Sequence, residues 1–538
     1  MQMKRTVFLL WLMVSFLTMA CASLLPERGP RATKTAATSQ AIAAAQETEI
    51  AETVVARQTA EAPTPTSTPV PTLTPTLTPT STPEPTATPR PTLVRLEADG
   101  SGDYATLQEA SGSVAEGGTI VLGPGTFRLV GTWAIIKSVR LVGAGMDQTQ
   151  IVTQHTIQVY RSELFAAEDI TFQHRGPLSS DVVEVFEGEV SLIRCRFTGA
   201  IQSAGAGSTA GLRLRGETTG TVQDCVAEEN EGYGILLTGS AQITLKENVC
   251  VENGESGVAY WAHSGGTANG NDCSRNGEAG ILIEGDAQPA LEENTCNDNA
   301  RDGIAYTENS AGVAKGNKLS GNEQNGIHVG DRAEPTLEEN TCSGNEWNGV
   351  VYWNWAGGVA RQNECTENKF SGIYVGKQSR PTLEENACRD NERAGIAYRD
   401  HGAGEARWNV CSGNVLAGIY VDGHAKPELN ENTCTENDGS GIAYWGNASG
   451  TASGNGCLRN GRAGIYVGGE AQPTVTGNTC TGNADAGIAY WDSAAGMASG
   501  NECSRNAAGI FVAASAVPEL KDNNCYGNTE EDVLDLRQ

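Results

Sequence analysis

The stretch Gly464–Asn483, GIYVGGEAQPTVTGNTCTGN, is one copy of a repeat that fills the C-terminal part of the chain. Its first Gly precedes an apolar residue, and glycines in this setting recur every 23 residues, with one final step of 22. These repeat glycines are Gly211, Gly234, Gly257, Gly280, Gly303, Gly326, Gly349, Gly372, Gly395, Gly418, Gly441, Gly464, Gly487 and Gly509. So regular a period indicates one supersecondary unit per repeat, each stacked on its neighbours.

Two series of asparagines keep the same step, one from Asn248 to Asn501 and the other from Asn253 to Asn506. Asn suits the turns of a stacked fold, because it tolerates the left-handed backbone region and its amide can bond the same amide one repeat away. The unit otherwise contains short alternating pieces, such as Gly-Ile-Tyr-Val and Thr-Cys, separated by Gly, Pro and Asn. Nothing in it is long enough for a helix, so the sequence predicts an all-β solenoid with 23-residue turns.

Turns of this length with three short strands resemble the right-handed, single-stranded parallel β-helix of carbohydrate-active proteins, the pectin-lyase-like fold. Gly464–Asn483 and the copy at 326–345, GIHVGDRAEPTLEENTCSGN, resemble the repeats of alginate-epimerase-like proteins and of the β-helix region of F-box ubiquitin-ligase subunits. The resemblance covers about 300 residues and is specific for fold rather than for function. No ubiquitin role is expected, because an export signal precedes the repeats and no F-box is recognised before them.

Residues 93–210 are expected to form an N-terminal cap and irregular first turns, followed by regular repeats with a C-terminal cap at 211–538. The segment Asp99–Ala110 resembles the opening of pectinesterase-type β-helices, which implies a short capping helix, and Gly117–Phe127 resembles their first strand and turn. No counterpart of the pectinesterase catalytic segments is present, so this likeness concerns architecture alone.

The N-terminus has the pattern of an export signal, predicted over 1–22. Positive residues precede the apolar stretch Val7–Ala20, which is short for a membrane span. The ending Leu17-Thr18-Met19-Ala20-Cys21 resembles a bacterial lipobox, which implies lipidation of Cys21, although Thr18 stands where Leu is usual. Ordinary signal cleavage after Ala20-Cys21-Ala22 is the alternative.

Two low-complexity segments separate this signal from the repeats. Residues 23–62 are rich in Ala, Thr and Gln and are compatible with a solvated helix. Residues 63–92 alternate Pro and Thr and offer no packing surface, which predicts an extended, disordered stalk that holds the next domain away from its anchor. A plain interdomain linker is the competing interpretation.

Odd and even repeats differ in two positions that change together. The third residue after the repeat Gly is Tyr306 in one turn and Val329 in the next, while a later position holds Ala314 and then Leu337. Each turn thus combines one large and one small residue, so these tyrosines are expected in the core.

Twelve cysteines form one column from Cys250 to Cys525, in which Leu319 fills the single gap. They occur once per turn rather than in Cys-x-x-Cys pairs, and His is absent from the column, which opposes a metal ladder. Parallel side chains in neighbouring turns also point alongside each other rather than across a disulfide. The column is therefore expected to pack as buried thiols.

Aromatic residues gather at two positions that strand alternation directs outward from one face. Four residues after the repeat Gly stand Trp261, Trp353, Trp445 and Trp491. Two residues after it, in alternate turns, stand His328, Tyr374, Tyr420, Tyr466 and Phe511. Trp on every second turn repeats at about 9.6 Å, near the length of a disaccharide, so this aromatic stripe is a candidate carbohydrate-binding face. The alternative is that the rings only cover their own backbone and neighbours.

The acidic residues of the repeats form columns. In one column Glu292, Lys315, Glu338, Arg361, Glu384 and Arg407 alternate in charge, which indicates a structural ladder of weak surface pairs. The next column holds Glu247, Glu293, Glu339, Glu385 and Glu431, in alternate turns. Carboxylates two turns apart cannot share one Ca²⁺ ion, so no metal site and no cofactor are predicted.

No catalytic constellation is recognised, and the segment Tyr-Gly-Phe-Asp-Pro-His of alginate epimerases does not occur. Any active site is expected in the irregular first turns, around Arg161, Glu163, Asp169, His174, Arg175, Asp181 and Glu184. If the protein is an enzyme, the resemblance implies a polysaccharide lyase, epimerase or hydrolase.

The chain has a formal net charge of -28, from 37 Lys and Arg against 65 Asp and Glu. Such a balance without a basic patch argues against nucleic acid as a partner, and it disfavours a polyanion unless a cation bridges the two. The first hypothesis is an exported protein, anchored at the membrane through Cys21, that binds an extracellular polysaccharide along the aromatic stripe, with or without modifying it. The second is a non-catalytic cell-surface scaffold or adhesion protein that makes protein–protein contacts.

Overall fold

The computed structural model describes residues 89–205 and 207–537. The expected signal peptide with Cys21, the Ala/Thr/Gln-rich segment and most of the Pro/Thr-rich stalk lie outside the described residues. Among the residues described, no helix is both long and apolar enough to span a membrane.

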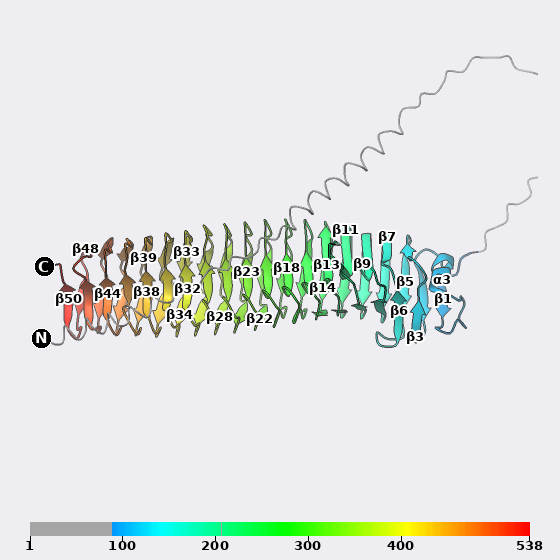
Figure 1. Ribbon diagram of the computed structural model, residues 1–538, viewed down its shortest axis with the longest axis horizontal. Coiled ribbons are helices and arrows are strands. Elements are labelled where there is room, and N and C mark those ends of the chain that lie inside the picture. The colour runs from blue at the N-terminus through cyan, green and yellow to red at the C-terminus, as the bar shows by residue number, and fades with distance from the viewer. Residues whose placement is uncertain (1–88, 206, 538) are drawn as a thin grey trace, which may run out of the picture. The chain divides into compact units, whose positions relative to one another are not determined.

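The described chain winds into a parallel β-helix, and successive turns follow one another along a single axis (Figure 1). The regular turns contribute strands to three rows, which we call rows 1, 2 and 3, and only in row 3 do the turns at Asp272 and Thr295 form isolated bridges instead. Rows 1 and 2 form one 34-stranded sheet, because β7 (Ile157–Glu168), β9 (Val183–Ile193) and β11 (Ala210–Gln223) run through both rows. Row 3 consists of a six-stranded and a ten-stranded sheet. The predicted solenoid is confirmed.

Row 1 contains the first halves of β7, β9 and β11 together with β4 (Ala134–Ile135), β13 (Tyr233–Gly239), β16 (Val258–Tyr260), β18 (Ile281–Ile283), β20 (Ile304–Tyr306), β23 (Ile327–Val329), β26 (Val350–Tyr352), β29 (Ile373–Val375), β32 (Ala394–Tyr398), β35 (Ala417–Val421), β38 (Ser440–Tyr444), β41 (Ile465–Val467), β44 (Ala486–Tyr490), β47 (Ala508–Val512) and β50 (Glu531–Asp535). Row 2 contains their second halves together with β1 (Leu93–Leu96), β2 (Gly118–Leu122), β5 (Val139–Val142), β14 (Gln242–Lys246), β17 (Gly265–Asn269), β19 (Ala290–Glu292), β21 (Val313–Lys315), β24 (Thr336–Glu338), β27 (Val359–Arg361), β30 (Thr382–Glu384), β33 (Ala403–Arg407), β36 (Lys426–Asn430), β39 (Thr451–Ser453), β42 (Thr474–Thr476), β45 (Met497–Ser499) and β48 (Glu519–Lys521). Row 3 contains β3 (Gly125–Arg128), β6 (Thr149–Thr153), β8 (Thr171–His174), β10 (Arg196–Thr198), β12 (Val226–Glu228), β15 (Val249–Val251), β22 (Lys318–Ser320), β25 (Thr341–Ser343), β28 (Glu364–Thr366), β31 (Ala387–Arg389), β34 (Val410–Ser412), β37 (Thr433–Thr435), β40 (Gly456–Leu458), β43 (Thr479–Thr481), β46 (Glu502–Ser504) and β49 (Asn524–Tyr526).

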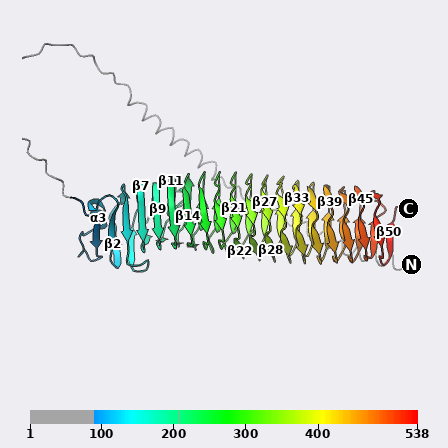
Figure 2. The same ribbon diagram turned by 180° about the vertical axis from the view of Figure 1, so that it is seen from behind.

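A short helix, α3 (Leu107–Ser113), lies at the N-terminal end of the β-helix (Figure 2). The Thr106 side chain caps it by accepting a hydrogen bond from the Glu109 backbone N–H. Leu107 and Ala110 are buried, so the helix shields apolar surface of the first turn.

The repeat glycine is required by close contact between turns. A Cβ built on Gly326 would lie 2.6 Å from the Gly349 carbonyl oxygen and 2.9 Å from Cys342 Cβ in the next turn. A second position that needs glycine is Gly312. Its φ is +110°, and a Cβ there would lie 2.2 Å from the Pro289 carbonyl oxygen. Glycine therefore recurs where only a hydrogen atom fits.

The asparagines stack as predicted. Asn340 donates from Nδ2 to Asn363 Oδ1 at 2.9 Å and to the Ala314 carbonyl at 2.8 Å, and its backbone N–H donates to the same Asn363 oxygen at 3.0 Å. The preceding residue, Glu339, has a φ of 53°, so the bend between strands is made in the left-handed region. These hydrogen bonds give the buried amides their partners. A buried amide without a partner would lower the stability of the fold.

The core contains the predicted pairing of one large and one small inward residue in each turn. Tyr306 and Val329 are fully buried, as are Ala314 and Leu337 in the same two turns. The cysteines from Cys250 to Cys503 are free and buried, which agrees with the expected thiol column. Hydrogen bonding to Cys365 and burial raise the pKa of the Cys342 thiol, as for an inert packed thiol.

Candidate functional site

The outer face of row 1 carries the aromatic stripe. In β29 the side chains of Ile373 and Val375 are fully buried, whereas Tyr374 between them is partly exposed. The same alternation places the second and fourth residues after each repeat Gly on the outside of the helix. The structure thus places all nine residues of the stripe on one face.

Three pairs of rings pack between successive turns along this face. The centroids of Trp353 and Tyr374 are 6.0 Å apart. Those of Trp445 and Tyr466 are 5.0 Å apart, and those of Trp491 and Phe511 are 4.6 Å apart. The last two pairs have interplanar angles of 31° and 30°, so their rings lie roughly along one surface. All three ring pairs lie between residues 353 and 511, two of them in the turns from Trp445 onward.

The rings also cover their own backbone, as the structural alternative expects. A Cβ on Gly376 would lie 2.8 Å from Tyr374 Cε1 and 2.9 Å from Trp353 Cζ3. Trp353 is half-buried, while Tyr466 and Phe511 are buried. Tyr374 and the tryptophans are only partly buried, so they are more exposed than Tyr466 and Phe511.

Trp261 is set apart from the other tryptophans. It packs edge-on against Tyr233, with ring centroids 5.5 Å apart and an interplanar angle of 81°. Leu236 and Leu282 belong to the same apolar cluster, and Trp261 is only partly buried in it. Its place in that cluster makes Trp261 more of a structural residue than Trp353 or Trp445.

A polar group that sequence reasoning missed interrupts the stripe. Arg399 Nη2 donates to Asp422 Oδ2 at 3.2 Å, and the Tyr420 hydroxyl donates to the same oxygen at 3.2 Å. The Gly423 backbone N–H donates to Asp422 Oδ1 at 2.7 Å. Arg399 stands four residues after its repeat Gly, the column that holds Trp353 and Trp445; reading that column in full would have found it.

Two further cations lie over aromatic rings near this group. The Lys377 ammonium is 4.5 Å from the centroid of the Trp353 ring, and the Arg393 guanidinium is 4.6 Å from that of the Phe370 ring. Both contacts have the geometry of cation–π interactions. Positive charge therefore accompanies aromatic residues in the turns that flank this part of row 1.

Half-buried acids lie in the turns that precede this region. Burial raises the pKa of Glu278, against the effect of Arg301, and burial together with Glu308 raises the pKa of Glu284. Further along the chain, burial raises the pKa of Asp485 to about 6. These three acids were not identified from the sequence. A carboxylate in a turn is expected to be solvated, and its burial depends on residues of other turns.

A His–Asp pair lies on the same face. His328 Nδ1 is 3.6 Å from Asp302 Oδ2. Burial opposes the charged imidazole, but the hydrogen bond and charge of Asp302 prevail, so the pKa of His328 is raised. Asp302 Oδ1 accepts from the backbone N–H and Nδ2 of Asn325, at 3.0 and 2.8 Å. This carboxylate is therefore held in place rather than left for a ligand.

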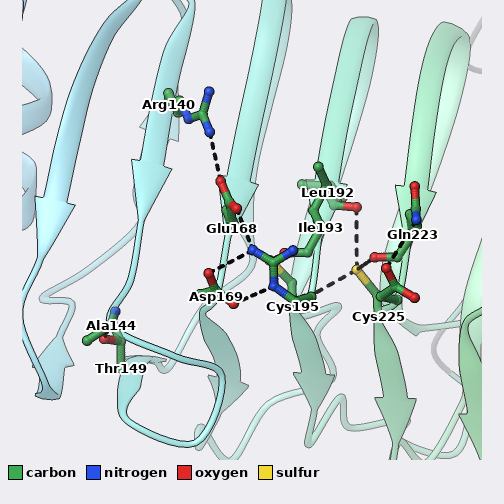
Figure 3. A network of polar contacts seen from close by, with 12 residues as sticks. Arg140, Ala144, Thr149, Glu168, Asp169, Leu192, Ile193, Cys195, Gln223 and Cys225 are labelled. Atoms are coloured by element: carbon green, nitrogen blue, oxygen red, sulfur yellow. Dashed lines mark hydrogen bonds and ion pairs between the residues drawn. The ribbon is translucent and has the colours of Figure 1, made fainter.

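The residues proposed from the irregular first turns are mostly engaged in ion pairs with other turns. Asp169 pairs with Arg194, which also binds Glu168, and Figure 3 shows Glu168 between Arg140 and this pair. The remaining acid pairs are Asp181 with Arg213 at 2.9 Å and Glu184 with Arg215 at 3.0 Å. Arg161 pairs with Glu187 at 2.8 Å. His174 is buried, and its Nδ1 is 3.2 Å from the Gly199 carbonyl oxygen. Glu163 and Arg175 are exposed. These pairs resemble structural links between turns more than an assembled active site.

A cavity of about 390 Å³ adjoins the network of Figure 3 on the outer side of row 2. It is lined by Ser138, Arg140, Leu164, Glu168 and Ser191, among others. Arg140 and Glu168 form an ion pair at 2.7 Å, so these two charged groups of the cavity wall are paired with each other.

The charge ladder runs along row 2 as predicted. Glu338 pairs with Lys315 at 3.7 Å and also with Arg361, and Arg407 pairs with Glu384. In the neighbouring column Glu339 has a left-handed φ, as have Gln362 and Trp408, which explains why Gly recurs at other turns of this column. Within residues 89–205 and 207–537, no group of three or more His, Cys, Asp or Glu is arranged to hold a metal ion.

The fold and the aromatic residues on the outer face of row 1 define the class of protein: a parallel β-helix with an aromatic outer face. The family model described as "Right handed beta helix region" matches residues 182–341, 315–433 and 408–531, so the chain belongs to this family. A comparison with curated protein sequences finds no match.

Several solved structures are similar in fold. The catalytic unit of the GH87 α-1,3-glucanase of Streptomyces thermodiastaticus is 16% identical over 73% of this chain, with a TM-score of 0.28, and the match spans 64% of the glucanase chain, less than two thirds of it. Pectate lyase Pel9A is 14% identical over 59% of this chain and 79% of its own, with a TM-score of 0.33. The A-module of the Azotobacter vinelandii mannuronan C-5 epimerase AlgE4 is 16% identical over 78% of this chain and 91% of its own, with a TM-score of 0.18. At these identities the likeness concerns the fold alone.

Proposed function

We propose that the protein binds an extended extracellular polysaccharide along the outer face of row 1. The observation that carries the proposal is the series of ring pairs, Trp353 with Tyr374, Trp445 with Tyr466 and Trp491 with Phe511. Aromatic faces stack on the C–H faces of sugars, and Trp445 and Trp491, which are two turns apart, are about 9.6 Å from each other along the axis. That step suits a disaccharide of an extended glycan.

The way the rings are held supports binding by their faces. Trp353 and Tyr374 both lie against Gly376, and the Lys377 ammonium lies 4.5 Å from the Trp353 centroid, so these rings are held in place before a ligand arrives. A ligand that meets a fixed ring loses less binding free energy to ordering than one that must immobilise a mobile side chain.

Export and tethering complete the proposal. The signal pattern at 1–22, the lipobox-like Cys21 and the stalk at 63–92 support a protein held at the cell surface on a spacer. The solved relatives named above include a glucanase, a pectate lyase and an epimerase, and modification of the bound glycan by this chain would fall within those kinds of reaction.

A non-catalytic scaffold that contacts other proteins is the second candidate. It is favoured by large aromatic side chains exposed on turns rather than on the stripe, namely Trp347, Trp355 and Trp408, which are 49%, 59% and 47% exposed. Exposed tryptophans are common at protein–protein contacts.

A binding experiment separates the two candidates. The full chain is applied to a glycan array, and positive glycans are titrated against the wild type, the double variant Trp353→Ala plus Trp445→Ala, and the control Trp408→Ala. We expect the double variant to lose at least about tenfold in affinity, since each lost stack is worth about 1 kcal/mol or more, while the control retains binding. No bound glycan, or equal affinity of the double variant and the wild type, refutes polysaccharide binding by this face.

A further inference from the structure

Arg399 occupies the position of a tryptophan in the aromatic stripe. In the turns that carry the core tyrosines, the fourth residue after the repeat Gly is, in successive 46-residue steps, Trp261, Thr307, Trp353, Arg399, Trp445 and Trp491. Arg399 therefore lies two turns, about 9.6 Å, from a tryptophan on either side. A ligand that lies along the stripe would pass over this guanidinium between two aromatic positions.

The guanidinium is held in place and remains accessible. Its side chain is 42% exposed. Asp422 accepts one of its N–H groups at 3.2 Å, and a guanidinium has five such donors. Asp422 is itself fixed by the Tyr420 hydroxyl and the Gly423 backbone N–H, so it acts as a support for Arg399.

Cations lie close to Arg399 although the whole protein is acidic, and Asp422 offsets the charge of Arg399 itself. The chain has a formal net charge of -28, which opposes a polyanionic ligand at long range. In the turns that flank row 1, however, Lys377 over Trp353 and Arg393 over Phe370 add two cations near Arg399. Short-range pairing with fixed cations is stronger than the screened field of distant charges.

We propose that the polysaccharide bound by the stripe carries a negatively charged substituent, and that Arg399 selects it by a charge-assisted hydrogen bond. This inference rests on the proposed function, since it names the class of glycan that the stripe would take. The charged substituent is a carboxylate or a sulfate ester, both of which match the planar donors of Arg. The flanking rings would stack on the neighbouring sugars.

The test measures the affinity of the full chain for length-matched oligosaccharides by calorimetric titration. The probes are a neutral oligoglucan, an oligogalacturonate that carries carboxylates, and a sulfated galactan oligosaccharide. The variants are Arg399→Gln, Arg399→Trp, which restores the aromatic series, and the control Arg361→Gln, an exposed arginine of the row 2 ladder. Thermal unfolding of each variant checks that the fold is retained.

The wild type is expected to bind one charged probe at least about tenfold more tightly than the neutral probe. Arg399→Gln should remove this preference, Arg399→Trp should remove it while keeping affinity for the neutral probe, and Arg361→Gln should leave it unchanged. Which charged probe is preferred distinguishes carboxylate from sulfate. Equal binding of neutral and charged probes by the wild type refutes the inference and leaves the proposed function standing, whereas no binding of any probe refutes both.

Discussion

Trp445 and Tyr466 come from neighbouring turns and hold their ring centroids 5.0 Å apart. They are not direct partners across the strands, because Tyr466 is in register with Ala443. The small residues Ala443 and Gly468 thus stand beside the two large ones. On the outer face of row 1, as in the core, a large residue in one turn therefore stands beside a small residue in the next.

Gly468→Ala should disturb the stripe without unfolding the protein. A Cβ at this position would lie 2.6 Å from the Tyr466 hydroxyl oxygen and 2.7 Å from Cε1, so the ring must tilt away from the backbone. We expect glycan affinity to fall several-fold while the midpoint of denaturant unfolding changes little. Gly456→Ala is the control, because a Cβ there meets nothing within 4 Å. Equal affinity of both variants would show that the flat ring is unimportant.

Asn386→Ala should be strongly destabilising. Asn386 donates to the Ala360 carbonyl at 2.8 Å and to Asn409 Oδ1 at 2.9 Å, and it accepts from Asn363. Each buried group left without a partner costs about 1–3 kcal/mol, so the free energy of unfolding should fall by more than about 2 kcal/mol. Asn523→Ala, at the less buried end of the same ladder, should cost less. Guanidinium unfolding followed by circular dichroism measures both, and equal costs would contradict this account.

Tyr398→Phe should leave stability unchanged or increase it. The side chain is fully buried, and its hydroxyl has no hydrogen-bond partner among the described residues. A buried hydroxyl without a partner costs about 1–3 kcal/mol. Tyr420→Phe is the matched control, because its hydroxyl donates to Asp422, and it should lower the free energy of unfolding by about 1 kcal/mol. A loss of stability in Tyr398→Phe would reveal a partner inside the core.

The period of Gly and Asn was enough to predict the β-helix, the stacked amides and the inward tyrosines, because each depends on contacts between identical positions of neighbouring turns. Arg399 and Asp422 were missed for the opposite reason. They depart from the repeat, and their significance depends on what stands at the same position one or two turns away. Asp485 could not be found from sequence at all, since the burial of its carboxyl depends on how several turns pack together.

The stability of the protein should depend on pH through Asp485. Burial raises its pKa to about 6 in the folded protein, against about 3.9 for an unperturbed Asp. Between these values the folded state binds more protons than the unfolded state, so the free energy of unfolding falls as the pH rises from about 4 to about 6. The total loss would approach 3 kcal/mol at about 1.4 kcal/mol per unit. In Asp485→Asn this contribution disappears, and the unfolding midpoint of the variant should exceed that of the wild type at pH 7 by more than it does at pH 4. Denaturant titrations at several pH values measure the difference, and parallel curves for the two proteins would show that the carboxyl is solvated in the folded state.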